Sequence, residues 1–156
     1  FADLVGFTEL AERLPDREVL ALLRRYYAAI ERAVFENGGT LDKYLGDGVM
    51  ATFGTPLPEP GNAEAAIRAA RAIVAAVDAI GCGLVVSVGV HFGRATVGDV
   101  GPARRLEFAV IGDTVNVACR LEAATREVGA RIVLSAALVA RARAEGMPEN
   151  ALAGFA

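Results

Sequence analysis

Residues 40–53 read Thr-Leu-Asp-Lys-Tyr-Leu-Gly-Asp-Gly-Val-Met-Ala-Thr-Phe, and they carry the clearest fold signal in the chain. Two runs typical of β-strands, 40–45 and 49–53, flank a short turn at 46–48. An Asp-Gly pair between two such runs is typical of a β-hairpin. The segment therefore predicts two neighbouring antiparallel strands joined by a tight turn.

Helical segments lie on both sides of this hairpin. Residues 9–37 carry apolar side chains at three- and four-residue spacing, and Pro15 predicts a break near the start. A loop rich in proline and glycine, 55–62, leads to a second helix at 63–80, which we expect Asn62 to cap.

The other elements complete a known arrangement. The sequence predicts a strand end at 1–4, a strand at 84–92, a connection at 93–102, a strand at 106–111, a helix at 114–128, a strand at 131–134, a helix at 135–145 that Ser135 caps, and no clear element at 151–156. The first six elements follow the βαββαβ order of a split βαβ, or ferredoxin-like, fold. We therefore expect an α+β fold with extra C-terminal elements, and helices covering one face of a mainly antiparallel sheet.

Length and composition narrow the class of protein. The 156 residues suit one domain, 1–156, which we interpret as trimmed at both ends because it begins inside an apolar strand. An apolar fraction of 54% supports a core, and a net charge of −3 argues against a dedicated nucleic-acid binder. Two cysteines are too few for a disulfide framework or a four-cysteine zinc site. No stretch approaches the ~20 apolar residues that span a bilayer, so we expect a cytoplasmic location.

Two acidic residues occupy unusual positions. Asp3 lies between Ala2 and Leu4 in an apolar strand end, and Asp47 lies at the hairpin tip. In a ferredoxin-like core the first strand lies beside the hairpin, so the two carboxylates can meet there. They would repel each other unless they share a cation, and Mg²⁺ binds through one or two carboxylates together with substrate phosphates. A helix-capping role for Asp3 and an ordinary turn role for Asp47 are the alternatives.

Four segments, in this order, resemble the catalytic domain of class III nucleotidyl cyclases, the adenylate and guanylate cyclases. They are FADLVGFT (1–8), KYLGDGVMATFG (43–54), GVHFGRATVGDVG (89–101) and VIGDTVNVACRLE (110–122). Together they are far more specific than any one alone, and the resemblance runs from Phe1 to about Ser135.

The resemblance implies a metal and phosphate site. Asp3 and Asp47 match the two acids that hold two divalent cations, Mg²⁺ or Mn²⁺, with the Leu4 carbonyl as a further ligand. In that family one ion lowers the pKa of the ribose 3′-hydroxyl and the other holds the triphosphate. Phe7 and Thr8 match the turn that contacts the phosphates.

The resemblance also implies a homodimer with two composite active sites. Asn116 and Arg120 match the pair that orients the ribose and stabilises charge at the α-phosphate. Their spacing of four places them on one helical face, which an ordinary solvated face would show as well. One chain would supply Asp3 and Asp47, and its partner Lys43, Asn116 and Arg120.

Base recognition follows the family pattern only in part. Lys43 matches a purine-reading position that is commonly lysine in adenylate cyclases and glutamate in guanylate cyclases. Ala109 stands at the second purine-reading position and has no hydrogen-bonding side chain. Ser87 stands where many members have a phosphate-binding arginine, which Arg94 is a candidate to replace. The late phosphate-binding lysine of the family is absent, because the chain ends at Ala156.

These patterns favour an adenylate cyclase that converts ATP to 3′,5′-cyclic AMP and pyrophosphate. We expect it to act in signal transduction, with regulatory or membrane domains flanking this chain and no nucleic-acid partner. Two alternatives stay open. One is a guanylate cyclase, and the other is a weakly active or non-catalytic nucleotide-binding domain that regulates a neighbour.

Overall fold

The computed structural model describes residues 1–81, 83–102 and 107–155, and its centre is a five-stranded sheet. The strands lie in the order β2-β3-β1-β4-β7. Their bounds are β1 Ala2–Val5, β2 Thr40–Leu45, β3 Gly48–Thr52, β4 Val85–Val90 and β7 Ile132–Leu134. Among the described strands of this sheet, β4 and β7 pair in parallel and the other pairs are antiparallel. This arrangement confirms the predicted α+β fold with a ferredoxin-like core and a mainly antiparallel sheet.

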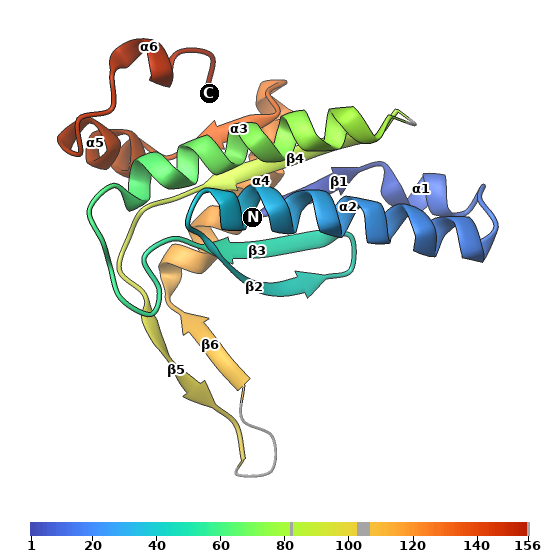
Figure 1. The fold of residues 1–156 in the computed structure, drawn as a ribbon, viewed down its shortest axis with the longest axis horizontal. Coiled ribbons are helices and arrows are strands. Elements are labelled where there is room, and N and C mark those ends of the chain that lie inside the picture. The colour runs from blue at the N-terminus through green and yellow to red at the C-terminus, as the bar shows by residue number, and fades with distance from the viewer. Residues whose placement is uncertain (82, 103–106, 156) are drawn as a thin grey trace.

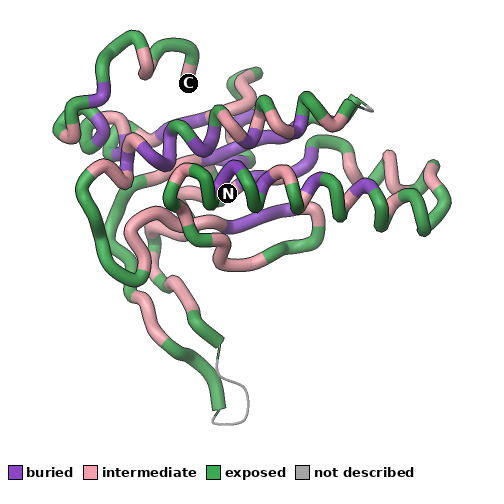
Figure 2. Tube along the Cα trace, viewed as in Figure 1, coloured by how far each residue is buried: buried purple, intermediate pink, exposed green. Residues whose placement is uncertain are grey.

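Two long helices, α2 (Asp16–Glu36) and α3 (Asn62–Ile80), cover one face of the sheet (Figure 1). The main core lies between them and the sheet, and Figure 2 shows the buried positions concentrated along these facing surfaces. Tyr26 and Ile30 of α2 and Val77 of α3 are fully buried there, together with Val86 of β4. The three- and four-residue spacing of the helices and the alternation of β4 both place their apolar side chains toward this layer.

The fourth helix, α4 (Asp113–Val128), packs on the opposite face of β4. On that face β4 presents Ser87 and Gly89, which alternate with the core valines. A Cβ on Gly89 would lie 2.1 Å from the backbone nitrogen of Glu122, so only glycine permits this approach. The expectation that helices cover a single face is therefore wrong, because small residues on the second face of β4 make room for α4.

A second, two-stranded sheet projects from the body of the molecule (Figure 1). It pairs β5 (Thr96–Val100) with β6 (Glu107–Ile111) in antiparallel register, with Gly98 opposite Ala109. The predicted connection at 93–102 is therefore wrong over β5, since this segment gains a hydrogen-bonded partner in β6. Leu106, where the second strand was predicted to begin, lies outside the described residues.

The chain before α2 and after β7 differs in detail from expectation. The predicted break at Pro15 is confirmed, because a short helix α1 (Phe7–Ala11) precedes α2. After α5 (Ala136–Ala144), the segment expected to lack structure begins within α6 (Glu149–Leu152). Over the described part of the chain, no helix combines the length and apolar character that a membrane span requires.

The N-terminal caps of α3 and α5 differ in how well the local sequence predicts them. The Ser135 hydroxyl accepts a backbone hydrogen bond at the start of α5, as predicted. Asn62 does not cap α3, because it is already the first helical residue and makes no side-chain cap. Instead, the Glu145 carboxylate accepts hydrogen bonds from the backbone nitrogens of Ala63 at 3.0 Å and Glu64 at 3.2 Å. Tertiary contact thus supplies the acceptor that the local sequence assigned to Asn62.

Candidate active site

The sheet brings the two predicted metal-binding acids together. Ala2 of β1 pairs with Val49 of β3, so Asp3 lies beside Gly48 in the antiparallel ladder. A Cβ on Gly48 would lie 3.2 Å from Asp3 Oδ1, and Asp47 is the next residue along the turn. The charge of Asp47 acts on Asp3, raising its pKa. Two carboxylates far apart in the sequence therefore share one end of the sheet.

The environment of Asp3 disfavours a bare negative charge. Burial is the largest cause that raises the pKa of the Asp3 carboxyl, followed by the charges of Asp47 and Glu122. The charge of Arg126 and hydrogen bonding from the Leu4 backbone act in the opposite direction. A like-charged pair of hard oxygen donors suits a divalent cation such as Mg²⁺ or Mn²⁺.

The protein ligands at Asp3 and Asp47 form an incomplete metal site. Across residues 1–81, 83–102 and 107–155, no group of three or more His, Cys, Asp or Glu side chains is arranged to hold a metal ion. Asp3 and Asp47 alone cannot complete the coordination of a divalent cation. Mg²⁺ commonly binds proteins through one or two carboxylates and completes its shell with water and substrate phosphates. The residues present therefore fit a cation that arrives with, or is completed by, a phosphate ligand.

An open cleft lies next to Asp47 and contains the predicted phosphate turn. Phe7 and Thr8 of α1 line it together with Gly46 and Asp47 of the hairpin turn and Tyr27 of α2. Its volume is about 630 Å³. The structure thus places Phe7, Thr8 and Asp47 around one space, as a site for a metal-bound polyphosphate requires.

Tyr27 anchors the turn that carries Asp47, a role that the sequence did not reveal. Its hydroxyl donates a hydrogen bond to the Gly46 carbonyl, and its ring lies 4.3 Å from the Tyr44 ring, centroid to centroid. Burial and then the charge of Asp47 raise the pKa of the Tyr27 phenol. Tyr27 belongs to the apolar stripe of α2, so its pattern indicated packing only. The one available signal was its hydroxyl, which needs a partner when its ring packs against other groups.

Asn116 and Arg120 lie on α4 with their side chains exposed. The Arg120 side chain is 71% exposed, and its Nη2 lies 3.7 Å from Asp113 Oδ1. Within the described residues, no hydrogen bond or ion pair joins Asn116 or Arg120 to Asp3 or Asp47. One chain therefore brings the acids and the phosphate turn together but leaves this predicted pair on its surface.

The two predicted purine-reading positions lie on different sheets. Lys43 lies beside an irregularity in β2, and its Nζ is 3.2 Å from Asp42 Oδ2. The Asp42 side chain is only 3% exposed, whereas that of Lys43 is 42% exposed. Ala109 lies on β6, in the projecting sheet, opposite Gly98. Asp42 went unnoticed in the sequence because a charged residue in a strand at the edge of a sheet is usually solvated.

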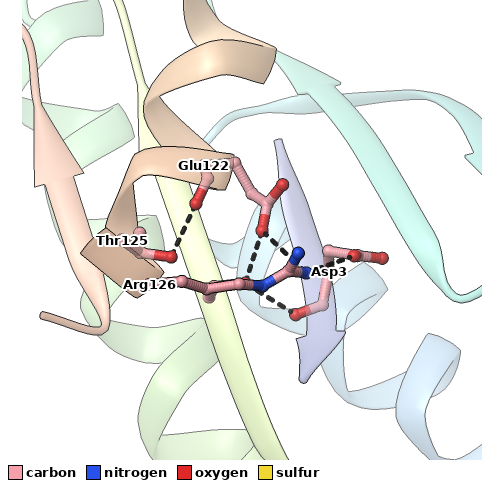
Figure 3. Close-up of polar contacts among 5 residues, drawn as sticks. Asp3, Glu122, Thr125 and Arg126 are labelled. Carbon is pink, nitrogen blue, oxygen red and sulfur yellow. Dashed lines mark hydrogen bonds and ion pairs between the residues drawn. The ribbon is translucent and has the colours of Figure 1, made fainter. Parts of the chain in front are cut away.

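A polar network links Asp3 to α4 (Figure 3). Arg126 Nη2 lies 3.4 Å from Asp3 Oδ2 and 4.0 Å from Glu122 Oε1. The Ser87 hydroxyl donates to the Glu122 carboxylate and lies 3.2 Å from the Asp3 carbonyl oxygen. Sequence reasoning missed Glu122 and Arg126, although their spacing of four is typical of an ion pair along a helix.

The structure shows where Ser87 lies, the residue that stands in place of a phosphate-binding arginine. Ser87 is 2% exposed and faces α4, so no cation projects from this position. Arg94, the candidate replacement, is exposed beyond the end of β4, and its backbone carbonyl accepts a hydrogen bond from Thr114. A different arginine, Arg126, has its guanidinium beside Asp3.

Known proteins resemble this chain in sequence. A family model for the adenylate and guanylate cyclase catalytic domain matches residues 1–148. The adenylate cyclase of Anabaena cylindrica is 34% identical over 151 residues, covering 89% of this chain and 29% of that protein. Adenylate cyclase 1 of Rhizobium meliloti (strain 1021) is also 34% identical over 151 residues, covering 92% of this chain and 23% of that protein. The chain therefore spans less than a third of the length of these curated relatives.

Solved structures agree with the family match. The adenylyl cyclase CyaB from P. aeruginosa superposes with a TM-score of 0.82 at 30% identity, covering 92% of this chain and 78% of that chain. The guanylyl cyclase Cya2 superposes with a TM-score of 0.75 at 28% identity, covering 90% of this chain and 75% of that chain. This chain belongs to the adenylate and guanylate cyclase catalytic domain family. The resemblance inferred from the four motifs is confirmed.

Proposed function

We propose that this chain is the catalytic domain of an adenylate cyclase, which converts ATP to 3′,5′-cyclic AMP and pyrophosphate. The observation that carries the proposal is the meeting of Asp3 and Asp47 beside a cleft lined by Phe7 and Thr8. Two adenylate cyclases at 34% identity support this choice of reaction. In this proposal the domain acts in the cytoplasm as part of a signalling protein.

In this proposal Asp3, Asp47 and the Leu4 carbonyl hold two divalent cations, Mg²⁺ or Mn²⁺. Bound there, the cations would activate the ribose 3′-hydroxyl and neutralise phosphate charge. Phe7 and Thr8 contact the phosphates from the turn after β1. Burial and the charge of Asp47 raise the pKa of Asp3, and a nearby cation would stabilise its ionised form, which supports a cation at this position.

The remaining predicted groups belong to a composite site in a homodimer. Asn116 and Arg120 are exposed and, within the described residues, form no hydrogen bond or ion pair with the acid pair of their own chain, which supports a role for them in the site of a second copy. Asn116 would orient the ribose, and Arg120 would stabilise the charge that develops at the α-phosphate. Mixing inactive Asp47→Ala chains with inactive Arg120→Ala chains should restore activity, since each mixed dimer holds one intact site. Failure of every mixture would exclude the shared site.

Lys43 supports ATP as the substrate, and Ala109 leaves selectivity to other groups. The similarity to a guanylyl cyclase structure keeps GTP as the second candidate. Turnover of ATP and GTP measured side by side distinguishes the two. Lys43→Glu should lower the ratio of ATP turnover to GTP turnover if Lys43 recognises the base. An unchanged ratio would exclude that role.

A weakly active or non-catalytic regulatory domain is the further candidate, favoured by the buried Ser87, which stands where many family members have a phosphate-binding arginine. Incubation with ATP or GTP and Mn²⁺, followed by detection of cyclic product, tests activity directly. We expect cyclic AMP from the wild type and none from Asp47→Ala. Nucleotide binding without any product, in a protein extended at both ends, would favour the regulatory domain. A fully active Asp47→Ala variant would contradict the metal role.

A further inference from the structure

Arg126 occupies a place that the proposed reaction does not explain. Its guanidinium lies between two carboxylates, 3.4 Å from Asp3 and 4.0 Å from Glu122. Asp3 is also a proposed cation ligand. A divalent cation bound to Asp3 would repel this guanidinium and compete with it for the carboxylate, because both carry positive charge.

Arg126 projects from a turn of α4 that is packed closely against β4. Glu122 has only a 10% exposed side chain and accepts a hydrogen bond from Ser87 of β4. Thr125 donates to the Glu122 carbonyl within α4, and Gly89 lets the Glu122 backbone approach the sheet. Figure 3 shows Arg126 extending from this anchored turn of α4 toward Asp3. The contact is therefore built into the packing of α4 on β4, although the Arg126 side chain itself is 55% exposed.

We propose that Arg126 makes cation binding at Asp3 depend on nucleotide. Without nucleotide, the guanidinium pairs with Asp3 and opposes the cation. The phosphates of a nucleotide that binds together with the cation at Asp3 would offer Arg126 a stronger acceptor, because guanidinium groups bind phosphate oxygens well. Arg126 then releases Asp3 to the cation. The inference rests on the proposed function, since it requires the cation site at Asp3 and Asp47.

The expected effect follows from the charge and exposure of the site. Removing one unit charge a few ångströms from a divalent ion, at a half-exposed position in physiological salt, should change the affinity roughly three- to tenfold. Arg126→Gln should therefore bind Mn²⁺ more tightly than the wild type when nucleotide is absent. Arg126→Lys keeps the charge and should stay close to the wild type.

The experiment measures Mn²⁺ binding by electron paramagnetic resonance, with and without 3′-deoxy-ATP, which lacks the attacking hydroxyl. We expect 3′-deoxy-ATP to strengthen Mn²⁺ binding to the wild type, and to strengthen it several-fold less in Arg126→Gln. A merely structural ion pair would leave this nucleotide effect unchanged. Arg143→Gln is the matched control, because Arg143 pairs with Glu149 and its side chain is similarly exposed, at 53%.

The outcomes separate this inference from the function on which it rests. If Asp47→Ala loses Mn²⁺ binding but Arg126→Gln binds Mn²⁺ no more tightly than the wild type, the role of Arg126 is refuted and the metal site stands. If Arg143→Gln matches Arg126→Gln, net charge explains the effect and the inference is again refuted. If Mn²⁺ binding does not depend on Asp47 at all, the metal site fails and the inference fails with it. Thermal melting of each variant establishes that it is folded before binding is compared.

Discussion

The close approach of α4 to the sheet can be tested by adding one methyl group at Gly89. In Gly89→Ala the new Cβ would lie 2.1 Å from the Glu122 backbone nitrogen and 2.6 Å from the Ala118 carbonyl oxygen. Since non-bonded heavy atoms rest at roughly 3.5–4.0 Å, α4 would have to retreat by more than ~1 Å. Both clashing atoms are backbone, so no side-chain rotation relieves the contact.

The magnitude follows from the cost of overpacking. Extra volume in a packed interior costs about 1–3 kcal/mol, and a backbone clash belongs at the upper end of that range. For a domain of this size 1 kcal/mol lowers the melting temperature by about 2–4 °C, so Gly89→Ala should melt roughly 6–12 °C below the wild type. The free energy of unfolding from urea titration should fall by about 3 kcal/mol in parallel.

Gly98→Ala provides the matched control. Gly98 also lies in a strand, but a Cβ there would meet nothing within 4 Å. Because glycine inside a strand costs about 0.5–1 kcal/mol relative to alanine, this variant should be as stable as the wild type or slightly more stable. A Gly89→Ala variant that melted within about 2 °C of the wild type, less than the effect of 1 kcal/mol, would contradict the close packing of α4 on β4.

Two further predictions concern the hairpin turn and the start of α3. Tyr27→Phe removes the hydrogen bond to Gly46 that holds the Asp47 turn. Because one such hydrogen bond contributes about 1 kcal/mol, its loss should weaken Mn²⁺ binding roughly fivefold. An unchanged Mn²⁺ affinity by titration would exclude the anchor role. Burial raises the pKa of Glu145, but hydrogen bonds from Arg141 and from the α3 backbone outweigh it and lower the pKa below 4.5. A lowered folded-state pKa contributes stability above pH 4.5 that is lost as the pH falls through the folded value. Glu145→Gln should therefore cost about 1 kcal/mol at pH 7 and progressively less in acid, and a cost independent of pH in urea titrations would contradict this account.

The acid pair shows how much of the candidate site can be predicted from the sequence. Asp3 and Asp47 stand out because each is an acid in an apolar or turn context, and the βαββαβ order makes their strands neighbours. Arg126 and Tyr27 do not stand out in this way. An arginine on a helix is usually solvated and a tyrosine in an apolar stripe usually packs, so their functional contacts emerge only from the placement of their helices.

Local patterns in the chain were sufficient for the hairpin, the long helices, the ferredoxin-like order and the family, because alternation, helical spacing and turn chemistry act between near neighbours in sequence. The position of α4 on the second face of the sheet, the pairing of β5 with β6 and the capping of α3 by Glu145 came from the folded molecule. Each of these depends on contacts between segments far apart in the chain. Such contacts are selected by packing and by the need of buried polar groups for partners, which no short stretch of sequence encodes.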